Sequence, residues 1–206
     1  MDVRFTTDPA GFLAETGPLL AADPVIASVV ATTTERAARE RAEGMPPPQR
    51  PCWWATVREG GEIVGVAMRT APNPPYPLFL MPMPDQAARA LATALHDRDE
   101  HPGGCNGALE AIRAFADETV RRWGGTAEAA QHTRLFECRD VIRPRAVPGL
   151  LRPAGIEDLE LVVEWHEAFH LDAAEQADRD PQTEIKPDQD TLRRHTTAGK
   201  YWLFVD

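Results

Sequence analysis

Two histidines four residues apart are the first candidates for chemistry in this sequence. They stand in His166-Glu167-Ala168-Phe169-His170, an H-E-x-x-H pattern within a segment whose apolar residues have helical spacing. Histidines at this spacing share one helix face and can bind Zn²⁺, while the glutamate acts as general base on the metal-bound water. A stripe along the helix predicts that both histidines point inward; it consists of Leu159, Val162, Val163, His166, Phe169 and His170.

The zinc interpretation lacks a third ligand. Glu175 follows the second histidine too closely for most such sites, and Glu184 needs an intervening turn to return to it. Zinc peptidases usually have a bulky apolar residue at the position of Ala168 and an apolar one at the position of Asp172. We therefore predict no metal site, and keep a zinc hydrolase at residues 166–170 as a third functional alternative. In the simpler interpretation, the histidines pack or form hydrogen bonds near the mouth of their domain.

Two further groups of residues have the chemistry to bind a ligand. Gly103-Gly104-Cys105-Asn106-Gly107 precedes a predicted helix; it could hold an anion, or it could be a turn that needs glycine geometry. Seven carboxylates lie on or just after the helix that carries the histidines, where they could attract a cationic amine or form a solvated acidic face. They are Glu164, Glu167, Asp172, Glu175, Asp178, Asp180 and Glu184.

The net charge limits the classes of partner. The 206 residues include 22 lysines and arginines against 32 aspartates and glutamates, a formal charge of −10. Phosphate backbones and anionic membranes need clustered cations, so we predict neither a nucleic-acid nor a membrane partner. No apolar run approaches the roughly 20 residues of a membrane helix, and the N-terminus lacks the pattern of a secretory signal. Cys52, Cys105 and Cys138 are odd in number and far apart, which indicates free thiols in the cytoplasm.

The elements that must position these residues have the order of a mixed α/β domain. Asp8 and Asp23 precede helices, and Gly60-Gly61 predicts a hairpin turn. The predicted helices begin near residues 9 and 25 and cover 85–96, with Asp85 as a cap, and 108–123. The predicted strands are 53–57, 63–70, 77–81, a short one within 103–107 and a last one at 133–142.

This order resembles the Gcn5-related N-acetyltransferase (GNAT) fold, as found in the N-terminal half of two-domain bacterial members. The resemblance rests on the order of elements and on two patches, Glu62-Ile63-Val64-Gly65-Val66-Ala67 and Asn106-Gly107-Ala108. It implies an α/β (α+β) fold with a mixed, mostly antiparallel sheet flanked by helices. It also implies acetyl-CoA as the cofactor of a complete family member and a small-molecule primary amine as its acceptor.

The turn that would hold this cofactor departs from the family's pattern. In that family the turn after the fourth strand carries Arg/Gln-x-x-Gly-x-Gly/Ala, whose backbone N–H groups and following helix N-terminus hold the coenzyme A pyrophosphate. The matching stretch, Met81-Pro82-Met83-Pro84-Asp85-Gln86, has no glycine. Pro82 and Pro84 have no amide hydrogen, and Asp85 places a negative charge beside the expected pyrophosphate. We therefore expect this chain to bind no acetyl-CoA.

A second domain is predicted to follow a linker at residues 143–149, which contains two prolines and a glycine. Residues 149–159 resemble the opening of another acetyltransferase domain, and residues 201–205 are predicted as its second strand. We thus expect a degenerate N-terminal domain at 1–142 and the first third of a C-terminal domain at 150–206, in a fragment of a longer polypeptide. The exposed edge of the strand at 201–205 could be covered by a second copy of the chain in a homodimer.

The resemblance implies acetyl transfer from acetyl-CoA to a primary amine as the function of the complete protein. The oxyanion and thiolate roles usually fall on segments that have no counterpart in this sequence, so no catalytic or cofactor-binding residue is assigned. We expect little acetyltransferase activity from these 206 residues. A non-catalytic binding or scaffold protein that keeps the fold is the alternative, and the identity of the amine acceptor stays open.

Overall fold

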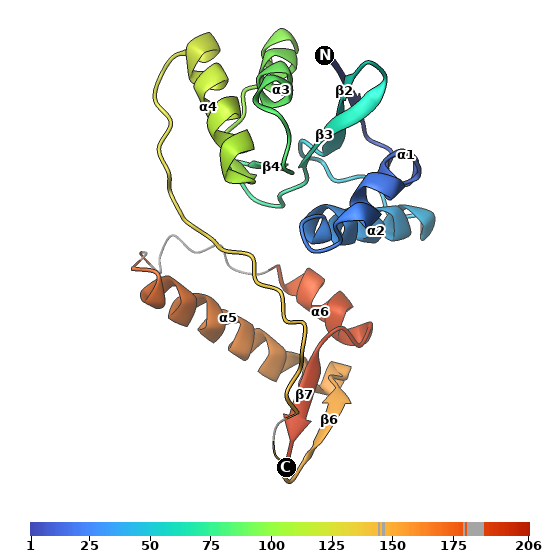
Figure 1. Ribbon diagram of the computed structural model, residues 1–206. Coiled ribbons are helices and arrows are strands. Elements are labelled where there is room, and N and C mark those ends of the chain that lie inside the picture. Colours follow the sequence, from blue (N-terminus) through green and yellow to red (C-terminus); the bar gives the residue numbers. More distant parts are fainter. Residues whose placement is uncertain (144, 146, 179, 181–187) are drawn as a thin grey trace. The chain divides into compact units, whose positions relative to one another are not determined.

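The computed structural model describes residues 1–143, 145, 147–178, 180 and 188–206 (Figure 1). The chain divides into two compact units, Met1–Cys138 and Arg139–Asp206. The described residues form six α-helices, one five-stranded mixed sheet that is mostly antiparallel, and a separate two-stranded sheet. The α/β class expected from the sequence is therefore confirmed.

The sheet of the first unit has a single parallel pair of strands. Its strands, in spatial order, are β1 (Asp2–Thr6), β2 (Trp53–Glu59), β3 (Glu62–Arg69), β4 (Leu78–Leu80) and β5 (Cys105–Gly107). Neighbours pair antiparallel except β4 and β5, which are parallel. Parallel neighbours cannot be joined by a tight hairpin, so the chain crosses over through helix α3 (Asp85–Asp97).

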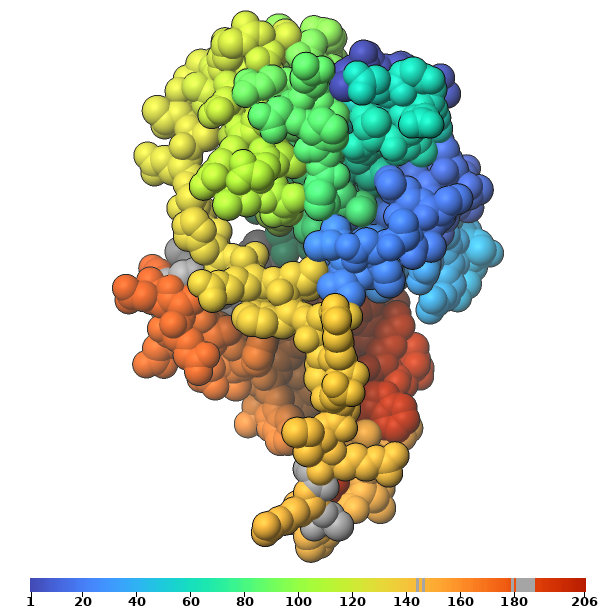
Figure 2. Space-filling view, in the orientation of Figure 1, coloured from blue at the N-terminus to red at the C-terminus, as the bar shows by residue number. Residues whose placement is uncertain are grey.

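Helices cover both faces of this sheet. On one face, α3 and α4 (Leu109–Trp123) lie side by side, green and yellow-green in Figures 1 and 2. On the other face lie α1 (Pro9–Ala22) and α2 (Ser28–Ala42). As predicted, Asp8 caps α1, since its carboxylate accepts a hydrogen bond from the Ala10 N–H.

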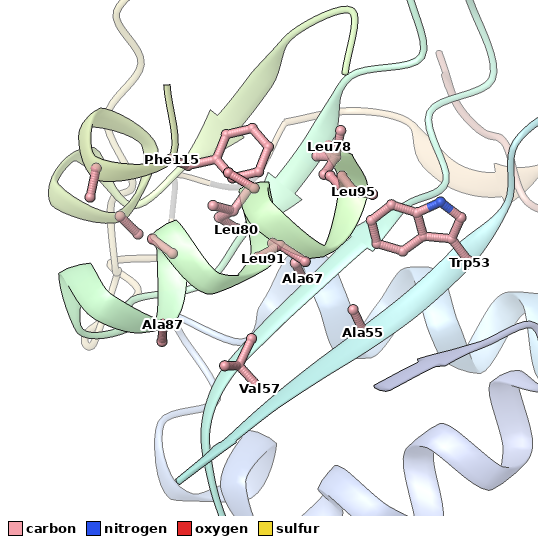
Figure 3. Packing of buried hydrophobic residues seen from close by; sticks show 14 residues of the cluster. Trp53, Ala55, Val57, Ala67, Leu78, Leu80, Ala87, Leu91, Leu95 and Phe115 are labelled. Carbon is pink, nitrogen blue, oxygen red and sulfur yellow. The ribbon is translucent and has the colours of Figure 1, made fainter. Parts of the chain in front are cut away.

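Strand β2 is buried on both of its faces. Trp53, Ala55 and Val57 belong to the hydrophobic cluster under α3 and α4, as Figure 3 shows. Trp54, between them in sequence, packs with Phe12 of α1 in the opposite cluster. Successive side chains of a strand point to opposite faces, so a strand covered on both sides needs a continuous apolar run. This requirement explains the pair of tryptophans at the beginning of β2.

Two elements differ from the prediction. Residues 2–6 form β1, which pairs with β2 over its full length, although the sequence had given no strand there. The predicted strand at 133–142 is wrong: its described residues form no strand, and Phe136 and Ile142 are 81% and 91% exposed. Alternating apolar residues form a strand only where a sheet edge accepts them, and no strand pairs with this segment.

The entrance to α3 also differs from the prediction. Asp85 is the first helical residue rather than the cap, and Pro84 stands at the cap position. Pro84 offers no side-chain hydrogen bond to the helix; its carbonyl accepts from the N–H groups of Ala87 and Ala88 at 2.8 and 3.1 Å. The carboxylate of Asp85 therefore lies in the first turn, where the partial positive charge of the helix N-terminus favours it.

The second unit repeats the opening order of the first. It contains β6 (Leu150–Pro153), a short 3₁₀ turn η1 (Ile156–Asp158), α5 (Leu159–Gln176), α6 (Gln189–Thr197) and β7 (Trp202–Val205). The flanking strands β6 and β7 pair antiparallel, as β1 and β2 do. Asp188 caps α6 by accepting hydrogen bonds from the N–H groups of Asp190 and Thr191.

An ion pair fixes the turn between β6 and α5. The Arg152 guanidinium donates to both carboxylate oxygens of Asp158, at 2.6 and 2.8 Å, and the Gly155 N–H donates to the same carboxylate at 2.8 Å. These hydrogen bonds, first those from Arg152 and then that from Gly155, lower the pKa of Asp158 to about 2. Among the described residues of this unit, few apolar side chains are buried, so polar contacts of this kind contribute a larger share of its stability. The buried ones are Ala154, Val162, Ala174, Leu192 and Leu203.

Removal of one buried hydroxyl is expected to destabilise the first unit. The Trp54 indole N–H donates to the Thr34 hydroxyl oxygen at 2.8 Å, and both residues are buried. Thr34→Val keeps the side-chain shape but leaves this donor without an acceptor, so we expect a loss of about 1–3 kcal/mol in the free energy of unfolding by urea. The matched control is Thr32→Val on the exposed side of α2, which should change stability by less than about 0.5 kcal/mol. Equal effects of the two substitutions would contradict this account.

Acid is expected to destabilise the second unit through Asp158. Its pKa is lower in the folded than in the unfolded chain, so the stabilisation is complete above about pH 5 and is lost progressively as the pH falls through 2 toward about 1. NMR signals of residues in β6 and η1 should report this loss during an acid titration. Asp158→Asn removes the titrating carboxyl group, so the stability of this variant should no longer fall with acid in the pH range assigned to Asp158. An unchanged acid response in that variant would assign the transition to other carboxylates.

Candidate functional site

The turn between β4 and α3 is poor in hydrogen-bond donors. Of residues 81–84, Pro82 and Pro84 have no N–H, and the Met81 N–H is used within the sheet, donating to the Val66 carbonyl at 3.0 Å. The exposed Asp85 carboxylate lies beside the first amides of the helix. A phosphate group at this point would meet a negative charge where other helix N-termini offer only donors.

The space beside this turn is filled by the protein's own side chain. A Cβ atom added to Gly65 of β3 would lie 2.9 Å from the Met83 sulfur and 3.0 Å from its Cβ. Gly65 therefore permits Met83 to lie directly on the strand, partly buried against the main hydrophobic cluster. The turn is packed onto the sheet instead of forming an open loop around a ligand.

The parallel pair β4 and β5 is closed by backbone hydrogen bonds along its shared length. The Leu78 N–H donates to the Gly104 carbonyl at 2.9 Å, and the Ala108 N–H donates to the Leu80 carbonyl at 3.0 Å. Gly107, with φ of +123°, makes this approach possible, because a Cβ there would lie 2.0 Å from the Leu80 oxygen. Glycine geometry in the segment 103–107 thus serves strand pairing, and neither strand offers a free edge to a ligand between them.

The two histidines of the H-E-x-x-H pattern lie together on α5. Their ring centroids are 4.8 Å apart and the rings are tilted by 37°. The predicted inward stripe is partly wrong: Val162 is buried and both histidines are half-buried, but Phe169 is 67% exposed. The small core of this unit covers only part of the stripe.

A metal site around these histidines would need a third ligand. Among the described residues, no group of three or more histidine, cysteine, aspartate or glutamate side chains is placed to hold a metal ion. Glu175 is exposed on the same helix, and Glu184 lies outside the described residues. The other acidic residues named from the sequence are exposed on α5 or just after it.

A buried polar cluster at the sheet's edge is structural. The Glu100 carboxylate accepts hydrogen bonds from the Trp53 indole N–H at 2.7 Å and from Arg69 at 2.8 Å, while Arg69 also donates to the Tyr76 carbonyl. Burial alone would raise the pKa of Glu100, but the hydrogen bonds from Trp53 and Arg69 and the charge of Arg98 hold it below its usual range. These contacts hold the segment that follows α3 against the ends of β2 and β3.

A cavity between α2 and the beginning of β2 combines three arginines with an apolar wall. Its volume is about 290 Å³. Charged side chains line it from α2 and from the segment that leads into β2, namely Arg36, Glu40, Arg41 and Arg50. The remainder of its wall is mostly apolar, formed by Pro9, Ala37, Met45, Pro46, Pro47, Pro48 and Trp54, with Thr33, Cys52 and Thr70. We call this the arginine pocket.

The arginine pocket was not anticipated from the sequence. Arg36 and Arg41 occur in a stretch rich in both charges, and Arg50 lies beyond a run of prolines, so no local pattern joins them. The available signal was the spacing of these two arginines, five apart on one helix, together with a third arginine two residues after three prolines. Only the return of the chain from α2 into β2 places the three in one wall.

Comparison with known proteins does not supply a relative: no protein-family model, curated protein or solved structure matches this chain. None of the helices among the described residues is long and apolar enough to cross a membrane. The function of this protein is therefore inferred from the turn after β4, the histidine pair and the arginine pocket.

The three cysteines should differ in reactivity. Burial raises the pKa of the Cys105 thiol to about 11, so only about one molecule in a thousand carries its thiolate at pH 8. Cys52 is half-buried and its pKa is also raised by burial, against the opposing charges of Arg50 and Arg41. Cys138 is exposed. Iodoacetamide at pH 8, followed by mass spectrometry, should modify Cys138 first and Cys105 last.

Denatured protein provides the control for this experiment. In urea all three thiols should react at similar rates, because burial no longer separates them. Modification of Cys105 as fast as Cys138 in the folded protein would contradict the position of β5 beneath α4.

Proposed function

We propose that residues 1–138 form a non-catalytic binding module with the fold of the Gcn5-related N-acetyltransferases. The order of elements supports this proposal: four antiparallel strands, a fifth strand parallel to β4, and α3 crossing between them. The same order led to the resemblance at the level of sequence. The module keeps a two-faced sheet while the segment expected to hold coenzyme A has lost the means to do so.

The observation that carries the proposal is the turn from β4 into α3. Acetyl transfer to an amine needs a base for the ammonium, a backbone donor for the thioester oxygen and an acid for the departing thiolate, with the cofactor fixed in place. A turn with two prolines and the carboxylate of Asp85 offers the pyrophosphate few donors and a repulsive charge. Met83 on Gly65 and the closed β4–β5 pair remove the neighbouring space.

Acetyl transfer from acetyl-CoA to a primary amine is the second candidate function. The observation that favours it is the repeat in the second unit, where β6, α5, α6 and β7 follow the order of β1, α1, α2 and β2. The exposed carboxylates of α5 would attract a cationic acceptor. In this alternative the chemistry belongs to a domain built on the second unit, and the first unit keeps its binding role.

Acetyl-CoA is expected neither to stabilise the 206-residue chain nor to be consumed by it. In a thermal-shift experiment, millimolar acetyl-CoA should leave the melting temperature unchanged, because the turn after β4 offers too few N–H donors to bind its pyrophosphate. Mass spectrometry with a panel of primary amines should detect no acetylated product. Leu91→Ala, which removes a fully buried side chain, should lower the melting temperature by several degrees and shows that the measurement is sensitive.

Two outcomes would overturn this proposal. One is release of coenzyme A with formation of an acetylated amine. The other is a stabilisation by acetyl-CoA that persists in Arg50→Gln, because binding through the phosphates at the arginine pocket would be lost in that variant. A rise in melting temperature that disappears in Arg50→Gln would assign acetyl-CoA binding to the arginine pocket. The turn after β4 would then still hold no cofactor.

A further inference from the structure

We infer that the arginine pocket binds a small phosphomonoester, a phosphate dianion on a compact apolar body. This inference rests on the proposed binding role of the first unit and gives it a class of ligand. It is independent of the turn after β4, because none of the residues of that turn lines the pocket.

The pocket contains a buried hydrogen-bond donor on Arg50 that has no acceptor. The positive charge of Arg50 lowers the pKa of Cys52 against the larger effect of burial, yet the Nη1 atom of Arg50 is buried and has no hydrogen-bond partner. A guanidinium nitrogen shielded from water without an acceptor is unfavourable, because its hydration is lost and nothing replaces it. An oxyanion in the adjoining cavity would supply the missing acceptor.

The second argument is the formal charge of the pocket. Three arginines and one glutamate line it, a net charge of +2 in a chain whose total charge is −10. No ion pair joins Glu40 to these arginines, and Arg41 uses its Nη1 atom on the Thr7 carbonyl at 2.7 Å. A phosphomonoester carries about −1.5 to −2 at pH 7, which matches this charge better than the single charge of a carboxylate. Guanidinium groups also present paired donors that suit phosphate oxygens.

The third argument is the size and lining of the cavity. About 290 Å³ is room for on the order of ten water molecules, so a ligand with roughly that number of non-hydrogen atoms fits. Three consecutive prolines, Met45 and the edge of Trp54 give one wall an apolar surface. Inorganic phosphate alone would leave this wall in contact with water, whereas an aryl or short alkyl phosphate would cover it.

Phenyl phosphate is the probe for this inference, titrated into the 206-residue chain at low salt by calorimetry. We expect saturable binding that is at least several-fold tighter than binding of inorganic phosphate, which lacks the apolar body, and of benzoate, which lacks the second charge. The Trp54 indole N–H signal in an NMR spectrum should shift during the titration, because Trp54 lines the pocket.

Arg50→Gln should weaken phenyl phosphate binding about tenfold or more, the effect of losing a hydrogen-bonded charge. Arg36→Gln, at an exposed position of α2 where folding is not at risk, should weaken it several-fold. The matched control is Arg113→Gln, the same change of charge on α4 away from the pocket, which should leave the affinity unchanged.

The inference is overturned if phenyl phosphate does not bind, or if all three variants bind it as the unaltered chain does. Tighter binding of benzoate than of phenyl phosphate would replace the phosphomonoester with a carboxylate ligand and would also overturn it. Acetyl-CoA also carries phosphates, and the Arg50→Gln variant assigns any stabilisation by it either to the arginine pocket or to the turn after β4. The two proposals can therefore fail independently.

Discussion

The first unit depends on one strand that is covered on both sides. Strand β2 pairs with β1 and β3 along its edges and contributes Trp53 to one hydrophobic cluster and Trp54 to the other. Because both clusters meet at this strand, the position of each helix pair relative to the sheet is fixed through it. Burial of an indole N–H without a hydrogen-bond acceptor is unfavourable. Both indoles have one, because Trp53 donates to the Glu100 carboxylate and Trp54 donates to the Thr34 hydroxyl. The same strand begins at the wall of the arginine pocket, so the core and the candidate ligand site share a common support.

In the first unit, the turn where a ligand was expected and the pocket that offers cations are different segments. The strand order and the α3 crossover are those on which coenzyme A chemistry was expected, yet the turn after β4 is packed onto Gly65 by Met83 and carries a carboxylate. The arginine pocket lies away from this turn, between α2 and β2. A fold supports many functions because sites depend on a few side chains, and the architecture can persist after one site is lost. For this reason the binding proposal is drawn from the residues of the pocket and not from the shape of the domain.

Local patterns in the sequence predicted most of the first unit correctly. The hairpin at Gly60-Gly61, the buried strand before residue 81 and the helix that ends at Trp123 each have a strong local signal of turn chemistry or periodicity. The predictions were wrong where strand formation depends on a neighbouring strand that the local sequence does not reveal. Residues 133–142 have apolar residues but no sheet edge to accept them, whereas residues 2–6 become a strand because β2 offers an edge. The arginine pocket was missed for the same reason, since its three cations come together only through the return of the chain into β2.

The stretch from the end of α4 to the start of β6 has a practical consequence. Its described residues between 124 and 149 form neither helix nor strand, and Phe136 and Ile142 stand in solvent. Backbone outside any helix or sheet ladder is accessible to proteases, and Arg134, which precedes Leu135, is exposed there as a cleavage point for trypsin. Boundaries of this kind also tolerate inserted sequence, so a reporter domain or an epitope tag placed in this stretch would interrupt no hydrogen-bonded element of either half.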